Sequence, residues 1–236
     1  MEISITERCT DMAAALGTLG AVITPERVAD ASSGEKKHYF KVTGACGKIP
    51  AAKVRADYRN GKLPMGHLLR RFFLGFRNRT VLLEWLEKGG GLHSVKGDDG
   101  WELVRGDRAL PGLTYGAAVF KTQNLKNAVA YISAGYDLLK VEGSWGSFVF
   151  YVEARGPEGF APDMITRWRT HPDSFTNDSI FAAVLQSLVN REKLISLIPD
   201  GYGRVLVRRP GTQRQVVLPE AASKKGWDAA RRFLLG

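Results

Sequence analysis

The chain carries a long internal repeat, and this feature limits its fold more than any other. Shifted by 112 positions, residues 38–105 align without a gap with residues 150–217, and twelve of the 68 columns are identical. For such a composition about four or five identities would arise by chance. Upstream, an offset of 115 aligns residues 13–20 with residues 128–135. The sequence therefore predicts one structural unit present twice; the alternative is two unrelated stretches that share helical periodicity and glycine-ended turns.

The clearest helix in the first copy is predicted over residues 65–86. Its apolar residues fall at the spacing of one buried helical stripe, which includes Leu69, Phe72 and Phe76. The second copy, residues 177–198, keeps the apolar character of this stripe. The stripe is therefore expected to be the scaffold that both copies share.

Other elements follow from turn residues and from β-branched or aromatic runs. Helices are predicted over 10–19, 50–59, 125–134 and 221–235, strands over 3–5, 21–23, 38–43, 117–121, 136–141 and 148–152, a turn over 28–36, and a hairpin over 89–105.

We therefore expect an α+β fold of two tandem degenerate repeats, each of order β-α-β-β-α-α-β-β, packed about a pseudo-twofold axis. The first repeat covers residues 1–110 and the second residues 111–220, and residues 221–236 form a basic C-terminal helical tail.

The positive charge is concentrated in two segments. The chain has a net charge of +10 and an isoelectric point near 9.7. Residues 51–79 carry +7 and residues 201–236 carry +6, whereas residues 1–50 are neutral and residues 80–200 carry −3. Such patches attract polyphosphate partners, so the sequence predicts nucleic-acid binding, to DNA or RNA. The alternative is a solvated face that confers only solubility.

The predicted phosphate contacts are the cations of the two patches. They are Lys53, Arg55, Arg59, Lys62, Arg70, Arg71, Arg77, Arg204, Arg208, Arg209, Arg214, Lys224, Lys225, Arg231 and Arg232. The second copy has Ala182, Ala183 and Val189 where the first has Arg70, Arg71 and Arg77, which suggests that the first binds through its helices and the second through its hairpin and tail. Arg79, matched by Arg191, is expected to be structural.

Trp101, on the predicted hairpin, is the candidate for stacking on exposed bases. Trp145 and Trp168 are expected to be core residues instead, because aromatic side chains bury a large apolar area.

The sequence does not favour catalysis. The four histidines are isolated, no phosphate-binding G-x-x-x-x-G-K-[ST] loop occurs, and no metal or cofactor site is expected. Asp30, Glu35 and Lys37 form a loose nuclease-like D...E-x-K pattern, but within a predicted turn. A metal-dependent nuclease is therefore kept as the second alternative.

The two cysteines, Cys9 and Cys46, are too few for a disulfide scaffold and lack the spacing of a zinc site. The N-terminus lacks the basic start and apolar run of a signal peptide, and no stretch of 18 apolar residues occurs. A cytoplasmic protein with no membrane contact is expected.

Residues 119–152, VFKTQNLKNAVAYISAGYDLLKVEGSWGSFVFYV, and the helix with Trp168 after them resemble a small uncharacterised domain family of phages and integrated mobile elements. The resemblance covers about a hundred residues and implies no activity. The order helix, strand, helix, helix, hairpin is also similar to a winged helix, tandem copies of which occur in plasmid replication initiators. The helix over 65–86 departs from that pattern by its length, unless it breaks near Asn78.

The sequence thus predicts a non-catalytic nucleic-acid-binding accessory protein. The alternative is a structural or protein-interaction component of a phage or mobile element, in which the positive charge binds an acidic protein or supports self-association.

Overall fold

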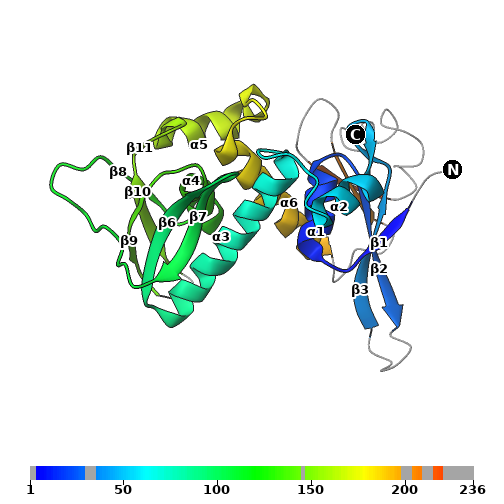
Figure 1. Ribbon diagram of the computed structural model, residues 1–236, viewed down its shortest axis with the longest axis horizontal. Coiled ribbons are helices and arrows are strands. Elements are labelled where there is room, and N and C mark those ends of the chain that lie inside the picture. The colour runs from blue at the N-terminus through cyan, green and yellow to red at the C-terminus, as the bar shows by residue number, and fades with distance from the viewer. Residues whose placement is uncertain (1–3, 30–35, 145–146, 198–203, 209–214, 220–236) are drawn as a thin grey trace. The chain divides into compact units, whose positions relative to one another are not determined.

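The computed structural model has the α+β fold class that the sequence predicts (Figure 1). It describes residues 4–29, 36–144, 147–197, 204–208 and 215–219. The chain divides into two compact units, which we call unit 1 (residues 1–63 and 189–236) and unit 2 (residues 64–188). These bounds differ from those of the predicted repeats, 1–110 and 111–220, which are a property of the sequence and stay a prediction.

Unit 1 is built on an antiparallel five-stranded sheet of order β1-β3-β2-β13-β14. The strands are β1 (Ile5–Glu7), β2 (Val22–Ala29), β3 (Lys36–Thr43), β13 (Arg204–Arg208) and β14 (Gln215–Pro219). A small hairpin, β4 (Ala45–Cys46) and β5 (Ile49–Pro50), leads into helix α2 (Ala51–Arg59). The unit also holds helix α1 (Thr10–Thr18) and the end of α6 (Ile180–Leu197).

The core of unit 1 lies around α1. Ala13, Ala14 and Ala15 are fully buried, as are Ile23 and Val42 on the sheet. A run of alanines lets the helix axis approach the strands closely, because no long side chain holds them apart. The alanine-rich run thus forms the predicted helix for reasons of packing as well as propensity.

Strand β2 is longer than predicted. It continues through Pro25 to Ala29, and β3 begins at Lys36, so Val28, Ala29 and Lys36, at the two ends of the turn predicted over 28–36, are strand residues. Residues 30–35 of that prediction lie outside the described residues. Pro25 has no N–H to donate, but within the described residues β2 pairs with β13 at Ile23 and not at Pro25, so the missing donor costs no bond on that side. The polar hairpin end lacks alternating apolar residues, which is why its strand character escaped prediction.

Unit 2 contains a three-stranded antiparallel sheet of order β8-β10-β9. Its strands are β8 (Val119–Thr122), β9 (Leu138–Glu142) and β10 (Val149–Glu153). Two hairpins accompany it, β6 (Gly91–Gly97) with β7 (Gly100–Gly106), and β11 (Arg155–Gly156) with β12 (Gly159–Phe160). The helices are α3 (Leu68–Lys88), α4 (Leu125–Ser133), α5 (Ala161–Thr170), the short 3₁₀ turn η1 (Pro172–Ser174) and the start of α6.

Helix α3 confirms the helix predicted over 65–86, with both ends moved. It begins after His67, whose Nδ1 accepts a hydrogen bond from the N–H of Leu69, and it runs without a break to Lys88. Gly89, at φ +68°, ends it in the left-handed conformation that favours glycine. Asn78 does not interrupt the helix because its side chain is buried and bonds to neighbouring groups.

The sheets of the two units share one pairing register. Glu7 pairs with Phe40 in unit 1, and Thr122 pairs with Phe150 in unit 2. Positions on β1 and α1 correspond to those on β8 and α4 at an offset of 115 residues, whereas α2 and α5 begin 110 residues apart. These offsets provide a position-by-position comparison of the two units.

The β4–β5 hairpin and α2 correspond to the β11–β12 hairpin and α5 at an offset of 110 residues, whereas the sequence alignment uses an offset of 112 for the same segments. That alignment matches Pro50 with Pro162, but Pro50 ends strand β5 and Pro162 lies in the first turn of α5. The helix predicted to start at Pro50 accordingly starts at Ala51. The predicted tail, residues 221–236, lies outside the described residues.

Candidate functional site

The predicted cations on α2 are engaged by acids of unit 1. Glu7 is 2% exposed, and its Oε2 lies 2.7 Å from Arg55 Nε and 3.1 Å from Arg59 Nη2. Lys53 Nζ forms an ion pair with Asp57 one turn along the helix, at 2.9 Å. Two arginines therefore share one buried carboxylate, which holds α2 against the end of β1.

The predicted cations on α3 are engaged by acids of the β6–β7 hairpin. Arg70 Nε lies 2.8 Å from Asp99 Oδ2, and Asp99, 7% exposed, also accepts a hydrogen bond from the N–H of Gly66. Arg77 Nη2 lies 3.0 Å from Glu102 Oε1. These arginines therefore join the helix to its hairpin, a role that sequence reasoning missed although the acidic hairpin was visible.

Arg71 donates from Nη1 to the carbonyl oxygen of Asn177 at 2.6 Å, within unit 2. Arg79, predicted to be structural, is half-buried and has an interaction partner. Its predicted counterpart Arg191 forms an ion pair with Asp11 of unit 1. The structural role predicted for Arg79 stays a prediction.

The hairpin predicted to bind phosphate in the second copy is β13 with β14. Arg204 and Arg208 lie at the two ends of β13, and the side chains of both are outside the described part of the chain. Also outside it are Arg209, Arg214, Lys224, Lys225, Arg231 and Arg232.

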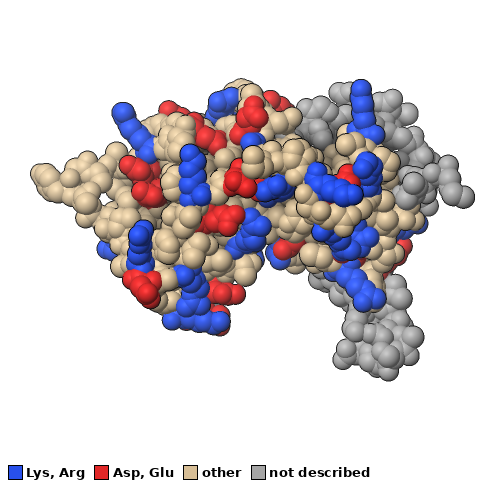
Figure 2. All heavy atoms as spheres, viewed as in Figure 1, with Lys and Arg blue, Asp and Glu red and all other residues tan. Residues whose placement is uncertain are grey.

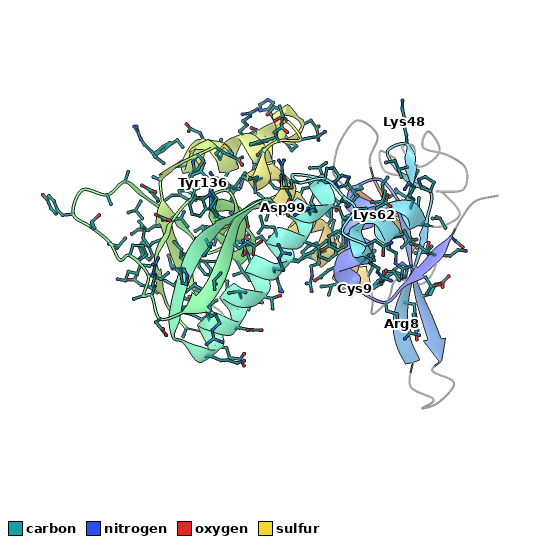
Figure 3. All side chains as sticks on the ribbon, viewed as in Figure 1. Arg8, Cys9, Lys48, Lys62, Asp99 and Tyr136 are labelled. Atoms are coloured by element: carbon teal, nitrogen blue, oxygen red, sulfur yellow. The ribbon has the colours of Figure 1, made fainter. Side chains whose placement is uncertain are left out.

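Several exposed cations of unit 1 have no carboxylate partner within the described ranges. They are Arg8, Lys41, Lys48 and Lys62 (Figure 3 labels three of them). The Arg8 guanidinium lies over the Tyr39 ring, 5.2 Å from its centroid. Lys48 stands at the tip of the β4–β5 hairpin, and Lys62 follows α2. These side chains can contact phosphates without breaking an ion pair.

The two compact units differ sharply in net charge. Residues 1–63 and 189–236 hold 20 lysines and arginines and 11 aspartates and glutamates, or +9, whereas residues 64–188 hold 14 and 13, or +1. In Figure 2 blue side chains gather around α2 with few red ones, while blue and red alternate over the elements of unit 2. The first basic patch of the sequence is therefore divided between a strongly basic unit and a nearly neutral one.

Trp101 is less exposed than predicted. The residue is half-buried, its carbonyl oxygen accepts a hydrogen bond from Asn78, and its indole lies against Gly135, where a Cβ would come within 2.4 Å of Nε1. Part of its ring is thus covered by Gly135 of the same unit. Its role in stacking on bases stays a prediction.

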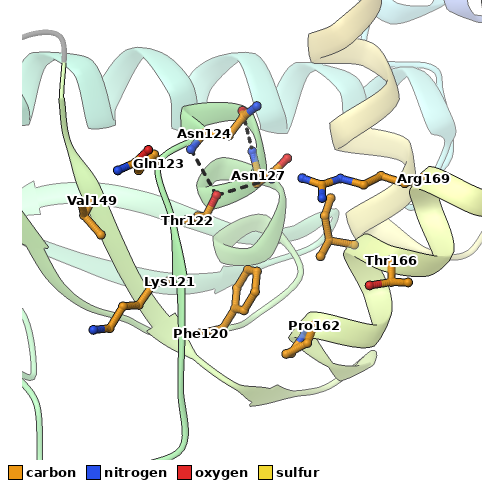
Figure 4. Close-up of a pocket in the computed structure, with 11 residues that line it drawn as sticks. Phe120, Lys121, Thr122, Gln123, Asn124, Asn127, Val149, Pro162, Thr166 and Arg169 are labelled. Atoms are coloured by element: carbon orange, nitrogen blue, oxygen red, sulfur yellow. Dashed lines mark hydrogen bonds between the residues drawn. The ribbon is translucent and has the colours of Figure 1, made fainter.

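Unit 2 contains an open pocket of about 690 Å³ between β8, α4 and α5 (Figure 4). Arg169 supplies its positive charge from α5, and its lining includes no acid. Lys121 also borders the pocket, with its Nζ over the Tyr151 ring. The other lining residues are Phe120, Thr122, Gln123, Asn124, Asn127, Val149, Pro162, Ile165 and Thr166.

The end of this pocket at α4 is fixed by side-chain hydrogen bonds. Thr122 Oγ1 accepts from the N–H of Asn124 at 3.1 Å and from Asn127 Nδ2 at 3.4 Å. Asn124 Oδ1 caps the helix by accepting from the N–H of Lys126 at 2.9 Å. Arg169 extends from α5 toward Asn127. The sequence alone did not single out this pocket, because its residues come from segments far apart in the chain.

Two buried tyrosines lie close to this region. Tyr131 donates to the carbonyl oxygen of Ala161 at 2.6 Å, and Tyr136 to that of Gly159 at 3.0 Å. Burial raises the pKa of Tyr131 far above its ordinary value, and burial together with Glu158 raises the pKa of Tyr136 to about 12. Both hydroxyls are therefore neutral at physiological pH and hold the chain next to α5 by hydrogen bonds.

In the described part of the chain, no group of three or more His, Cys, Asp or Glu side chains could hold a metal ion. Of the nuclease-like pattern, Asp30 and Glu35 lie outside the described residues, and Lys37 lies on β3 with its side chain not described. No helix within the described ranges is long and apolar enough to cross a membrane.

The chain is thus an α+β protein of two compact units, one strongly basic and one with a polar pocket. No protein-family model matches it, and comparison with curated proteins and with solved structures gave no significant match.

Proposed function

We propose that the protein is a non-catalytic nucleic-acid-binding accessory protein that contacts phosphates mainly through unit 1. The observation that carries this proposal is the charge of +9 on unit 1 beside +1 on unit 2. Each phosphate that a lysine or arginine neutralises releases a counterion, so a unit with this excess gains affinity for any nucleic acid.

The ion pairs within the protein determine which lysines and arginines can contact phosphates. Arg70 and Arg77 would have to leave Asp99 and Glu102 to reach a phosphate, whereas Lys48 and Lys62 have no carboxylate partner among the residues that the structure describes. Breaking the Arg70–Asp99 pair leaves the buried Asp99 carboxylate uncompensated, and separating the exposed Arg77–Glu102 pair loses a weaker, solvent-screened attraction, so both losses offset part of the gain. We therefore rank the exposed lysines of unit 1 above the arginines of α3 as phosphate contacts.

We place this activity in the cytoplasm. Neither Cys9 nor Cys46 is in a disulfide, and Cys46 is buried with its Sγ 3.7 Å from the carbonyl oxygen of Leu16. Cysteines in the thiol form agree with a reducing compartment.

The test is fluorescence anisotropy of the full chain with labelled duplex DNA, single-stranded DNA and single-stranded RNA over a series of potassium chloride concentrations. Saturable binding that weakens steeply with salt supports the proposal. Lys48→Ala with Lys62→Ala is expected to reduce the log–log salt slope by about 2, one per phosphate contact. Lys88→Ala with Lys96→Ala, two exposed lysines of unit 2, is the matched control and should leave the slope unchanged.

Other outcomes point to the alternatives. Absence of binding to all three nucleic acids would favour the structural or protein-interaction component of a phage or mobile element. Cleavage that needs a divalent metal ion would favour the nuclease.

A further inference from the structure

The pocket of unit 2 has a counterpart in unit 1 that is filled by a side chain. The shared register puts Thr122 in the place of Glu7. The offset of 110 between α2 and α5 puts Arg169 in the place of Arg59. The same two positions, at a strand end and on a helix, can therefore be compared directly in the two units.

One function of Glu7 is kept in unit 2. Glu7 Oε1 accepts a hydrogen bond from the N–H of Cys9, two residues along the chain, at 2.9 Å. Thr122 Oγ1 accepts from the N–H of Asn124, also two residues along, at 3.1 Å. The threonine thus replaces one carboxylate oxygen at the start of the helix.

The other function of Glu7 is not kept. Its Oε2 forms the ion pairs with Arg55 and Arg59, but the side chain of Thr122 is too short to reach across to α5. The position of Arg55 is taken by Ile165, which lines the pocket. In unit 2 the cavity thus lies where unit 1 holds a buried carboxylate against an arginine.

The cation of the pocket on α5 is available to a ligand. Arg169 is exposed and has no ion pair or hydrogen bond within the described residues. Lys121 follows Phe120 and precedes Thr122 on β8, so its side chain lies on the opposite face of the sheet, with Nζ 5.0 Å from the centroid of the Tyr151 ring. An anion beside Thr122 would therefore meet the charge of Arg169 and no acidic lining residue.

We propose that this pocket binds the carboxylate of a small organic acid, which Arg169 holds in the way that Arg59 holds Glu7. A guanidinium can donate two parallel hydrogen bonds to one carboxylate, so a single arginine suffices for orientation. Phe120 and Ile165 offer an apolar wall for the body of the ligand, and Thr166 offers a hydrogen bond. The volume, about 690 Å³, is in the range of small-molecule sites. This site does not depend on nucleic-acid binding by unit 1.

The test is an NMR titration of the full chain with N-acetylglycine, a carboxylate probe with a short amide body, followed on the Arg169 Nε–H and on the side-chain amides of Asn124 and Asn127. Saturable shifts of these signals are expected. Arg169→Gln should weaken binding at least tenfold. Arg167→Gln is the matched control on the same helix, because Arg167 bonds to Ser174 and does not line the pocket, and it should bind like the wild type.

Thr122→Glu provides an independent variant. The new carboxylate would take the position that Glu7 has in unit 1 and pair with Arg169, so it should exclude the probe while Thr122→Ser still binds it. Unsaturated or absent shifts, unchanged affinity in Thr122→Glu, equal binding of the neutral N-acetylglycinamide, or tighter binding of inorganic phosphate would each overturn the proposal.

Discussion

Asn190 donates a hydrogen bond from Nδ2 to Thr18 Oγ1 at 3.1 Å, and both residues are at most 1% exposed. Asn78 donates in the same way to Ser133 Oγ at 2.8 Å. The two asparagines are 112 residues apart, and their partners 115. Each bond joins one predicted repeat to the other, so each compact unit is made from parts of both.

We expect Asn78→Ala to be strongly destabilising. Asn78 donates to the carbonyl oxygen of Trp101 at 2.7 Å as well as to Ser133, and its Oδ1 accepts from the N–H of Leu103 at 2.8 Å. Each buried group left unpaired costs about 1–3 kcal/mol, so a loss of at least 2 kcal/mol is expected in urea unfolding.

Asn60→Ala is the control for that measurement, because Asn60 is exposed and ends α2. Its free energy of unfolding should stay within about 0.5 kcal/mol of the wild type. Equal losses in the two variants would contradict the role given to Asn78.

Gly75→Ala should also destabilise the protein, against the helix propensity of alanine. A Cβ at Gly75 would lie 2.6 Å from Cγ1 of Val184 on α6, and both positions are buried. Overpacking costs about 1–3 kcal/mol, more than the roughly 1 kcal/mol that alanine gains over glycine within a helix.

The check is a double-mutant cycle with Val184→Ala, measured by urea unfolding. Removing the valine methyls makes room for the new Cβ, so the double variant should be more stable than the sum of the single losses predicts. Strict additivity would show that α3 and α6 do not limit each other at this point.

These contacts show which parts of the structure could be predicted. Helix α3 was predictable because its apolar spacing and the glycine after Lys88 are local signals. The pairing of Arg70 with Asp99 was not, since it depends on the hairpin folding back on a helix 29 residues earlier. Glu7 likewise meets Arg55 only through the tertiary fold, so charge counted along the sequence overstated the cations free to bind phosphate.

Acidification should weaken the start of α3. Burial lowers the pKa of His67, and its neutral Nδ1 accepts from the N–H of Leu69. A pKa lower in the folded than in the unfolded state means that the unfolded chain binds the proton first, so stability is present above about pH 6.5 and is lost as pH falls through the folded pKa. Urea midpoints between about pH 7.5 and 5 should show this fall.

His67→Asn separates this effect from general acid sensitivity. Asparagine is a good helix cap and does not titrate, so the variant should lose less stability than the wild type over that range. If both lose the same amount, His67 is not the titrating group.

At alkaline pH we expect the free energy of unfolding to decrease as pH rises, because the buried tyrosines keep their protons in the folded protein. The pKa of Tyr136 is about 12 in the folded protein and about 10 in an unfolded chain. Between these values the unfolded chain has already released its proton, so the free energy of unfolding falls as pH rises, by at most about 1.4 kcal/mol per pH unit for one group.

Tyr136→Phe removes the titration together with the bond to Gly159, so it should be less stable than the wild type at pH 8 and show a shallower decline from pH 10 to 11.5. A parallel decline in the two proteins, followed by urea unfolding, would show that Tyr136 does not hold its proton in the folded state.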